Sequence, residues 1–305
     1  MFIKLAIKII IFMSKPVTTK KRAEIQEPST SEALEEINTI TSVSSEKRVF
    51  KPSKEFSSKA HIKSFKEYQD IYKKSIRNPK KFWAEKAKQL DWFKKWKSVL
   101  RNDNGHFKWF EGGKINVTYN CLDRHIKAGK KDKPAIIWEG EDGTVKKFTY
   151  EQLLSQVNRF ANVLKNKKLK KGDRVCIYLP MIPELAIAML ACARIGVIHS
   201  IVFGGFSSEA LKDRINDSKA KMLITADGSF RNGKIYPLKE NADTALKECK
   251  TIKHTIVVRR TNNIPNLHNK QTWWEDEMLS PKVSNECDPE KLDSEDPLFI
   301  LYTSG

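Results

Sequence analysis

From about residue 126 onward, short apolar runs alternate with amphipathic stretches along the chain. The apolar runs predict buried strands at residues 135–138, 175–179, 197–202, 222–225, 255–258 and 297–302. Helix-start signals stand between them: a capping box at residues 149–152, a proline at Pro183 and a serine at Ser207. Asp142-Gly143 predicts a hairpin turn after the first strand. This alternation predicts an α/β fold with mostly parallel sheets flanked by helices.

Upstream of this region, aromatic and apolar positions follow a helical spacing. The residues that share the spacing are Phe65, Tyr68, Tyr72 and Ile76. Pro79 ends this pattern, and the aromatic residues of 82–83 and 92–96 predict a second, lysine-rich helical stretch. We interpret both as a packed helical cap whose lysine stems cover apolar surface, because base-stacking platforms are typically built on sheets.

The composition divides the chain into three parts. Residues 14–60 are rich in Ser, Thr, Lys and Glu and hold few large apolar side chains, so we expect residues 1–60 to form a disordered lead-in. Residues 61–125 are expected to form a small helical leader domain, and residues 126–305 the α/β domain.

The first 13 residues are apolar but are interrupted by Lys4 and Lys8. A segment this short does not span a bilayer, which takes about 20 apolar residues, and residues 14–16 make a poor signal-peptide cleavage site. Two interpretations remain open, namely a true start at Met13 or an anchor on a membrane surface. We expect no membrane partner.

The chain is strongly basic, with 56 Lys and Arg against 37 Asp and Glu and a net charge of +19. Such an excess is compatible with binding to nucleic acid or to an anionic surface. Most of the cations are lysines, however, whereas arginine is the preferred residue for bidentate recognition of phosphates and bases. We attribute the charge to a compositional bias and expect no nucleic-acid partner; binding of a polyanion by the basic leader remains the alternative from a different functional class.

The cysteines and histidines show no spacing typical of disulfides or metal sites. The five cysteines are Cys121, Cys176, Cys192, Cys249 and Cys287. Their number is odd and they form no C-x-x-C pair, so we expect free thiols in a reducing cytoplasm. The six histidines form no ligand pair at metal-binding spacing, and we assign no metal ligand to the chain.

Three glycine-bearing or polar segments follow predicted strands: Gly204-Gly205, residues 227–234 and Thr303-Ser304-Gly305. Parallel sheets bind ligands beyond the carboxyl ends of their strands. The middle segment places Arg231 and Lys234 three residues apart on a loop, which suits a phosphate held by charge-assisted hydrogen bonds. A solvated loop there, and an ordinary strand end at 303–305, remain open at this point.

The motifs of the chain resemble those of one enzyme family. They lie at residues 109–116, 120–125, 203–214, 224–227, 237–241 and 293–305. Together they are similar to the acetate–CoA ligases (acetyl-CoA synthetases) of the adenylate-forming superfamily, and the resemblance covers about residues 64–305. It implies an incomplete adenylation domain preceded by the helical domain typical of these enzymes.

The resemblance also implies substrates and binding residues. In this family acetate, Mg²⁺-ATP and coenzyme A react through an acetyl-AMP intermediate. The resemblance assigns coenzyme A binding to Gly205, Arg231, Asn232, Gly233 and Lys234. It assigns the start of the ATP-phosphate loop to Thr303, Ser304 and Gly305. We interpret Gly112 and Gly113 as residues that shape the backbone.

The family pattern is incomplete in this chain, because the phosphate loop, the acyl pocket and the catalytic lysine would follow Gly305. We therefore assign no catalytic residue and expect the 305 residues to be inactive as a ligase by themselves. A related ligase for propionate or another short acid is the alternative within the family, because the residues that select the acyl chain are missing. Oligomeric state is left open.

Overall fold

The computed structural model describes residues 50–263 and 265–303. Contacts divide the chain into two compact units, residues 2–82 and residues 83–305, which are considered separately. The expectations for the lead-in up to residue 49 and for the apolar first 13 residues lie outside the described residues. In the described part of the chain, no helix has the length and apolar character needed to cross a membrane.

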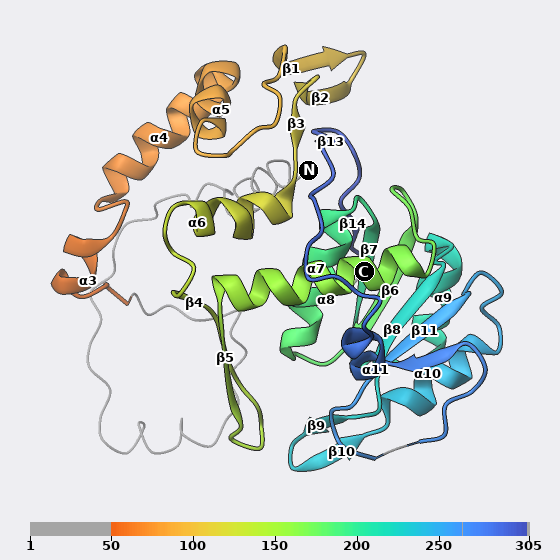
Figure 1. Ribbon diagram of the computed structural model, residues 1–305. Coiled ribbons are helices and arrows are strands. Elements are labelled where there is room, and N and C mark those ends of the chain that lie inside the picture. Colours follow the sequence, from red (N-terminus) through yellow and green to blue (C-terminus); the bar gives the residue numbers. More distant parts are fainter. Residues whose placement is uncertain (1–49, 264, 304–305) are drawn as a thin grey trace, which may run out of the picture. The chain divides into compact units, whose positions relative to one another are not determined.

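The described part of the first unit is helical (Figure 1). It holds α3 (Lys54–Lys59), α4 (Phe65–Arg77) and the first residues of α5 (Pro79–Ala87). Helix α3 falls within the expected lead-in, so the last residues of that segment are ordered, with a serine cap at Ser53. The helical spacing of α4 is confirmed, and its rings stack along the helix, with Phe65 6.0 Å from Tyr68.

The second unit opens with a cluster of aromatic rings. The expected helix over residues 92–96 is wrong: α5 ends at Ala87, and Phe93 donates a backbone hydrogen bond to the carbonyl of Lys114 in an extended segment. The rings nevertheless converge, because Trp92 lies 4.8 Å from Trp96 and 5.4 Å from Phe110 between ring centroids. Packing of these rings against one another, and not a helix face, produces the spacing.

Strands follow this cluster, so the leader region is not purely helical. β1 (Ser98–Asp103) and β2 (His106–Glu111) form an antiparallel hairpin, and the short β3 (Lys114–Ile115) pairs with β13 (Leu292–Asp293). The π-helical turn η3 (Tyr119–Asp123) and α6 (Arg124–Lys127) complete the connection.

A second hairpin and a long helix lead into the main sheet. β4 (Pro134–Glu139) and β5 (Val145–Thr149) are antiparallel, and their turn contains Gly143 at φ +75°, which confirms the predicted Asp-Gly turn. Helix α7 (Tyr150–Asn166) begins with the predicted capping box, in which Thr149 and Gln152 each accept the other's backbone N–H.

The main sheet has six parallel strands in the order β12-β11-β8-β6-β7-β14. Its strands are β6 (Arg174–Leu179), β7 (Ile198–Phe203), β8 (Met222–Ala226), β11 (His254–Val258), β12 (Gln271–Trp273) and β14 (Phe299–Ile300). Its helices are α8 (Pro183–Arg194), α9 (Ser208–Ser218), α10 (Leu238–Leu246) and α11 (Trp274–Leu279). The predicted parallel α/β architecture is confirmed, although the last strand is shorter than expected.

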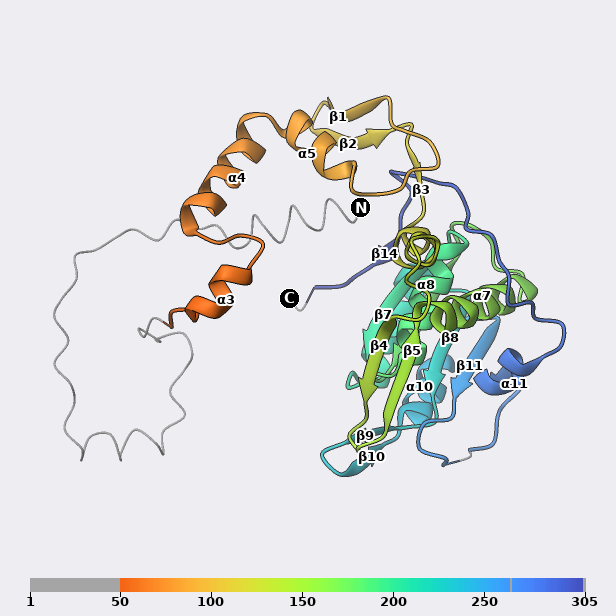
Figure 2. The same ribbon diagram turned by 60° about the vertical axis from the view of Figure 1, so that its left-hand side comes forward.

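The strand order fixes which face each helix covers. The connection from β6 to β7 runs in one direction along the sheet, and the connections from β7 to β8 and on to β11 run in the other. Since such connections are almost always right-handed, α8 lies on one face and α9 and α10 lie on the opposite face (Figure 2 labels α8 and α10). The direction reverses between β6 and β8, and the carboxyl ends of strands at such a switch point form a crevice.

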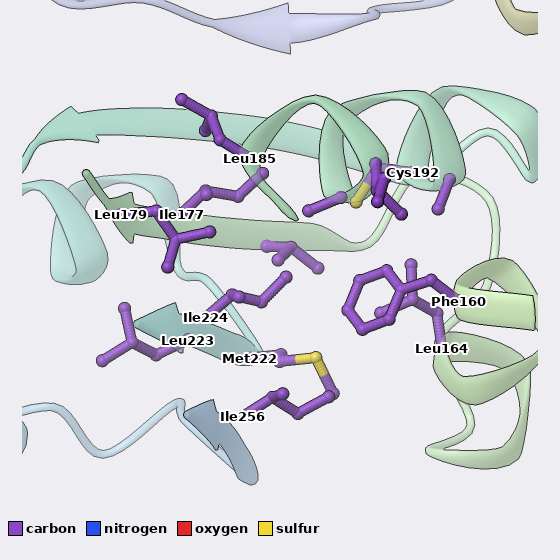
Figure 3. Close-up of a cluster of buried hydrophobic side chains, with 14 of the residues drawn as sticks. Phe160, Leu164, Ile177, Leu179, Leu185, Cys192, Met222, Leu223, Ile224 and Ile256 are labelled. Atoms are coloured by element: carbon purple, nitrogen blue, oxygen red, sulfur yellow. The ribbon is translucent and has the colours of Figure 1, made fainter. Parts of the chain in front are cut away.

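The core fills the space between α7, α8 and the sheet (Figure 3). Phe160 of α7 stacks on Trp274 of α11 at 3.8 Å between ring centroids. Ile177 and Ile224, from β6 and β8, are fully buried beneath these helices. Each such side chain contributes about 1.5–3 kcal/mol through burial, so the strand ends at the crevice rest on a rigid base.

Candidate functional site

A cleft of about 350 Å³ lies beyond the carboxyl ends of β6, β7 and β8, at the switch point of the sheet. Its walls come from residues 138–141, 179–182, 203–205 and 229–231, together with Tyr236 and Arg260. The first of these segments is the end of β4 with the start of the β4–β5 turn, and the others follow strands of the main sheet. Segments far apart in the sequence therefore meet where a parallel sheet is expected to bind a ligand.

The glycine turn after β7 forms one wall. Phe206 donates a backbone hydrogen bond to Phe203 at 3.0 Å, and the buried Tyr178 hydroxyl donates to the carbonyl of Phe206 at 2.7 Å. A Cβ added at Gly205 would lie 2.9 Å from Nη1 of Arg231. Glycine at this position therefore lets the Arg231 guanidinium lie against the backbone, and the structure brings together two of the residues assigned by resemblance to coenzyme A.

The basic segment after β8 is not an irregular loop, as the sequence suggested, but a β-hairpin. β9 (Ser229–Arg231) pairs with β10 (Lys234–Tyr236), and Arg231 and Lys234 are direct cross-strand partners. Asn232 and Gly233 form the two-residue turn at φ +51° and +69°. Asn-Gly is the strongest short-range signal for such a turn, and that signal was missed. The hairpin register sets the two cations side by side.

Both cations are exposed and available to a ligand. Within residues 50–263 and 265–303, neither the Arg231 guanidinium nor the Lys234 ammonium has a hydrogen-bond or ion-pair partner. Arg231 lines the mostly apolar cleft and Lys234 is its cross-strand neighbour, so these two cations, unpaired among the described residues, favour an anionic group attached to an aromatic or apolar body.

Arg260, which sequence reasoning missed, ties the walls of the cleft together. Its guanidinium lies 5.2 Å from the Trp138 ring centroid and 4.6 Å from that of Phe230. It also pairs with Asp142 at 3.3 Å, and the hydrogen bond from Arg260 lowers the pKa of the Asp142 carboxyl. No sequence spacing links these residues, because they come from three separate segments and meet only in the folded chain.

Asp227, in the matching Ala-Asp pair, supports the site without facing a ligand. It is buried, and its carboxylate accepts backbone hydrogen bonds from Gly228, Arg260 and Thr261 at 2.7–3.1 Å. The carboxylate thereby joins the carboxyl ends of β8 and β11, so it holds the base of the β9–β10 hairpin and the start of the Arg260 segment in fixed relation.

The segment expected to begin the phosphate loop leaves the sheet next to the glycine turn. Ile300 of β14 pairs with Ser200 of β7, so the exposed Thr303 follows its strand at the same edge at which Phe203 ends β7. The Arg214 guanidinium lies 4.8 Å from the Phe206 ring and 5.2 Å from the Tyr302 ring, which links the two segments. Ser304 and Gly305 lie outside the described residues.

The signature at residues 109–125 lies away from the cleft and serves packing. The Asn116 amide donates to the carbonyls of Ala193 and Arg194 at 3.1 and 3.0 Å, which satisfies the last turn of α8. Arg194 is 3% exposed and forms a bidentate pair with Asp123 at 2.8 and 2.9 Å. Gly112 adopts φ +78°, which agrees with our interpretation of this glycine as a residue that shapes the backbone, whereas Gly113 is needed for packing, because a Cβ there would lie 2.7 Å from the Trp92 ring.

Two family models match the chain. The model of the AMP-binding enzyme family covers residues 122–305, and that of the acetyl-coenzyme A synthetase N-terminus covers residues 68–121. The chain belongs to the AMP-binding enzyme family. The family resemblance expected from the motifs is thereby confirmed. The two matches meet inside η3, in the middle of the packed signature segment.

Curated proteins named acetyl-coenzyme A synthetase align with most of the chain. The protein from Leptospira biflexa is 56% identical over 265 residues, 85% of this chain and 40% of the relative. That from Chlorobaculum tepidum is 46% identical over 87% of this chain and 40% of the relative. The chain therefore spans about 40% of the length of these relatives.

A solved structure shares the fold. Acetoacetyl-CoA synthetase from Streptomyces lividans superimposes with a TM-score of 0.74 at 22% identity, covering 84% of this chain and 41% of that one. At this identity the likeness shows the fold alone, and it agrees with the parallel α/β architecture described above.

All five cysteines are free thiols, as expected, and burial raises the pKa of Cys176 and Cys192 far above the usual range. Among the described residues, no group of three or more His, Cys, Asp or Glu side chains is placed to hold a metal ion.

Proposed function

We propose that the complete enzyme ligates acetate to coenzyme A at the expense of ATP. An acetate oxygen attacks the α-phosphorus of ATP and expels pyrophosphate, which forms acetyl-AMP. The thiol of coenzyme A then attacks the acyl carbon and expels AMP while its proton passes to solvent. Activation is needed because a free carboxylate is a poor acyl donor, and cations and backbone donors stabilise the charge that develops.

The observation that carries the proposal is the cleft at the switch point, where Gly205 lies beside Arg231, which has no hydrogen-bond or ion-pair partner among the described residues. We assign the 3′-phosphate end of coenzyme A to this cleft. Arg231 and Lys234 hold the phosphate, Asn232 and Gly233 form the turn between them, and Gly205 lets the ligand pass close to the backbone. Lysine at 234 supplies charge without the fork of arginine, so it contributes less to orientation.

ATP is assigned to the neighbouring strand end. Thr303, Ser304 and Gly305 form the start of the loop that holds its phosphates, with backbone N–H groups and hydroxyls as donors. Magnesium accompanies ATP in this proposal, but the residues described in the structure contain no cluster suited to it, and we assign it no ligand in this chain. We further propose that the partners are small molecules only and that the enzyme works in the cytoplasm.

Arg231→Ala tests the coenzyme A assignment in the complete enzyme. We expect the KM for coenzyme A to rise about tenfold to a hundredfold, as loss of a charge-assisted contact implies. Acetate-dependent exchange of pyrophosphate into ATP should stay near its normal rate, because coenzyme A enters only after adenylation. Arg101→Ala, which removes another exposed arginine from a hairpin strand, is the matched control and should leave both readouts unchanged.

Normal coenzyme A affinity in Arg231→Ala would contradict the site assignment. Loss of pyrophosphate exchange in the unsubstituted enzyme would contradict the reaction itself. The 305 residues alone should show no turnover, so measurable ligation by this purified chain would contradict our view that the reacting centre lies elsewhere. A series of acetate, propionate and butyrate with the complete enzyme decides between acetate and the other short acids.

A further inference from the structure

The tip of the β9–β10 hairpin offers a backbone donor between two cations. Asn232 and Gly233 both adopt left-handed φ values, of +51° and +69°, and the flanking Arg231 and Lys234 are cross-strand partners. In a two-residue turn of this kind the Gly233 N–H points away from the hairpin ladder. The tip therefore presents one N–H and two positive charges, which is the donor set that binds an anion.

A carboxylate of the same chain already accepts a hydrogen bond from that N–H. Glu141, in the turn of the β4–β5 hairpin, accepts a hydrogen bond from Gly233 N at 2.8 Å (Figure 1 and Figure 2 show the two hairpin tips side by side). Among the described residues, no ion pair links Glu141 to Arg231 or Lys234. The carboxylate thus takes the backbone donor, and neither cation gains a partner from the described part of the chain.

The backbone beneath Glu141 is fixed while its side chain is exposed. Gly140 donates to Thr144 at 2.8 Å, and Asp142 pairs with Arg260 at 3.3 Å. Release of the Glu141 carboxylate from Gly233 therefore needs only rotation of one exposed side chain, which is a small and fast change.

We propose that Glu141 is an internal competitor of the 3′-phosphate of coenzyme A for the hairpin tip. This inference rests on the proposed function, since it takes the tip as the phosphate site. While no ligand is bound, the carboxylate holds the place of a phosphate oxygen at Gly233, and its charge opposes an anionic group that enters the tip. A ligand with a dianionic phosphate displaces it because both cations then gain a partner, whereas a ligand without that phosphate has nothing to exchange for it.

The rival explanation is that Glu141 simply braces the hairpin. The two roles predict opposite results for Glu141→Gln, which keeps an oxygen acceptor for Gly233 but removes the charge. Competition predicts tighter binding of coenzyme A by about threefold to tenfold, as expected for removing one charge near a dianion in a partly screened site. A brace predicts no change in Glu141→Gln and weaker binding in Glu141→Ala.

The test is isothermal titration calorimetry of the 305-residue chain with coenzyme A and with dephospho-coenzyme A, which lacks the 3′-phosphate. We expect Glu141→Gln and Glu141→Ala to lower the Kd for coenzyme A and to change that for dephospho-coenzyme A by less than about twofold. Glu151→Gln, which makes the same charge change at an exposed glutamate in the first turn of α7, outside the walls of this cleft, is the control and should leave both values within about twofold.

An unchanged or higher Kd for coenzyme A in Glu141→Gln overturns the inference, and so does equal tightening in Glu151→Gln. These results leave the proposed function intact, because the unsubstituted chain still binds coenzyme A. Failure of the unsubstituted chain and of every variant to bind coenzyme A contradicts the coenzyme A assignment itself, and the inference falls with it.

Discussion

Two regions of this chain carry motifs of the family, but their charged side chains differ in whether they are paired within the protein. Around α8 the signature residues satisfy one another: Arg194 is 3% exposed and is bound by Asp123 and by the carbonyl of Cys287. At the cleft, Arg231 and Lys234 are exposed and have no partner among the described residues. A motif charge with internal partners maintains the fold, whereas a motif charge left free is available to a ligand.

Arg194→Met should give the largest loss of stability. It leaves the Asp123 carboxylate half-buried without its bidentate partner, and breaking a buried pair in this way costs about 3–5 kcal/mol. Urea denaturation of the purified chain measures the free energy of unfolding. Lys88→Ala, which removes an exposed pair with Glu85, should cost less than about 0.5 kcal/mol. Equal losses in the two variants would contradict the contrast between the regions.

His199 shows the effect of a buried ring nitrogen that has no hydrogen-bond partner among the described residues. It lies on β7 at 4% exposed, its Nδ1 has no hydrogen bond in the described structure, and burial lowers its pKa to about 4 from 6.5. Because the folded value lies below the unfolded one, the unfolded chain binds the proton more readily. The contribution of His199 to the free energy of unfolding is therefore fully present above pH 6.5. It should fall by about 3 kcal/mol as the pH drops from 6.5 toward 4.

The check is the slope of unfolding free energy against pH in the unsubstituted chain and in His199→Asn. The variant is neutral throughout, so it should lose this part of the slope between pH 6.5 and pH 4 while carboxylates contribute equally to both proteins. Identical slopes would show that His199 is free to take up its proton in the folded state.

Tyr178 connects the interior to the cleft, and its substitution should lower stability by an intermediate amount. Its buried hydroxyl donates to the carbonyl of Phe206 at 2.7 Å and thereby holds the turn that contains Gly205. Tyr178→Phe should cost about 1 kcal/mol of stability, the usual net value of one hydrogen bond. We also expect a severalfold weaker affinity for coenzyme A, because the turn loosens; unchanged affinity would show that the turn does not depend on this bond.

The same contrast explains what could be predicted from sequence. The predictions of the strands and of helix α7 were correct because an apolar run, or the capping box at Thr149, determines structure within a few residues of itself. The expected helix at residues 92–96 failed, because Trp92 and Trp96 owe their spacing to packing against Phe110. One local signal was overlooked: Asn-Gly at 232–233 is typical of a hairpin turn, but we expected a loop there.

Only some residues of the candidate site could be predicted from the sequence. Gly205 and Arg231 were named through family resemblance, and the structure places them against each other. Arg260 and its contacts with Trp138 and Phe230 were not foreseen, because the three come from separate segments and meet only after the sheet has formed. Tertiary contacts of this kind leave no period or spacing in the chain.

Arg231→Ala should have the smallest effect on stability and so tests the contrast most sharply. The side chain is exposed and has no partner in the described part of the chain, so its removal should change the free energy of unfolding by less than about 0.5 kcal/mol. Urea denaturation beside Arg194→Met makes the comparison between two arginines of one protein. A loss of several kcal/mol in Arg231→Ala would mean that this cation supports the hairpin internally, and its assignment to a ligand would then lose its physical basis.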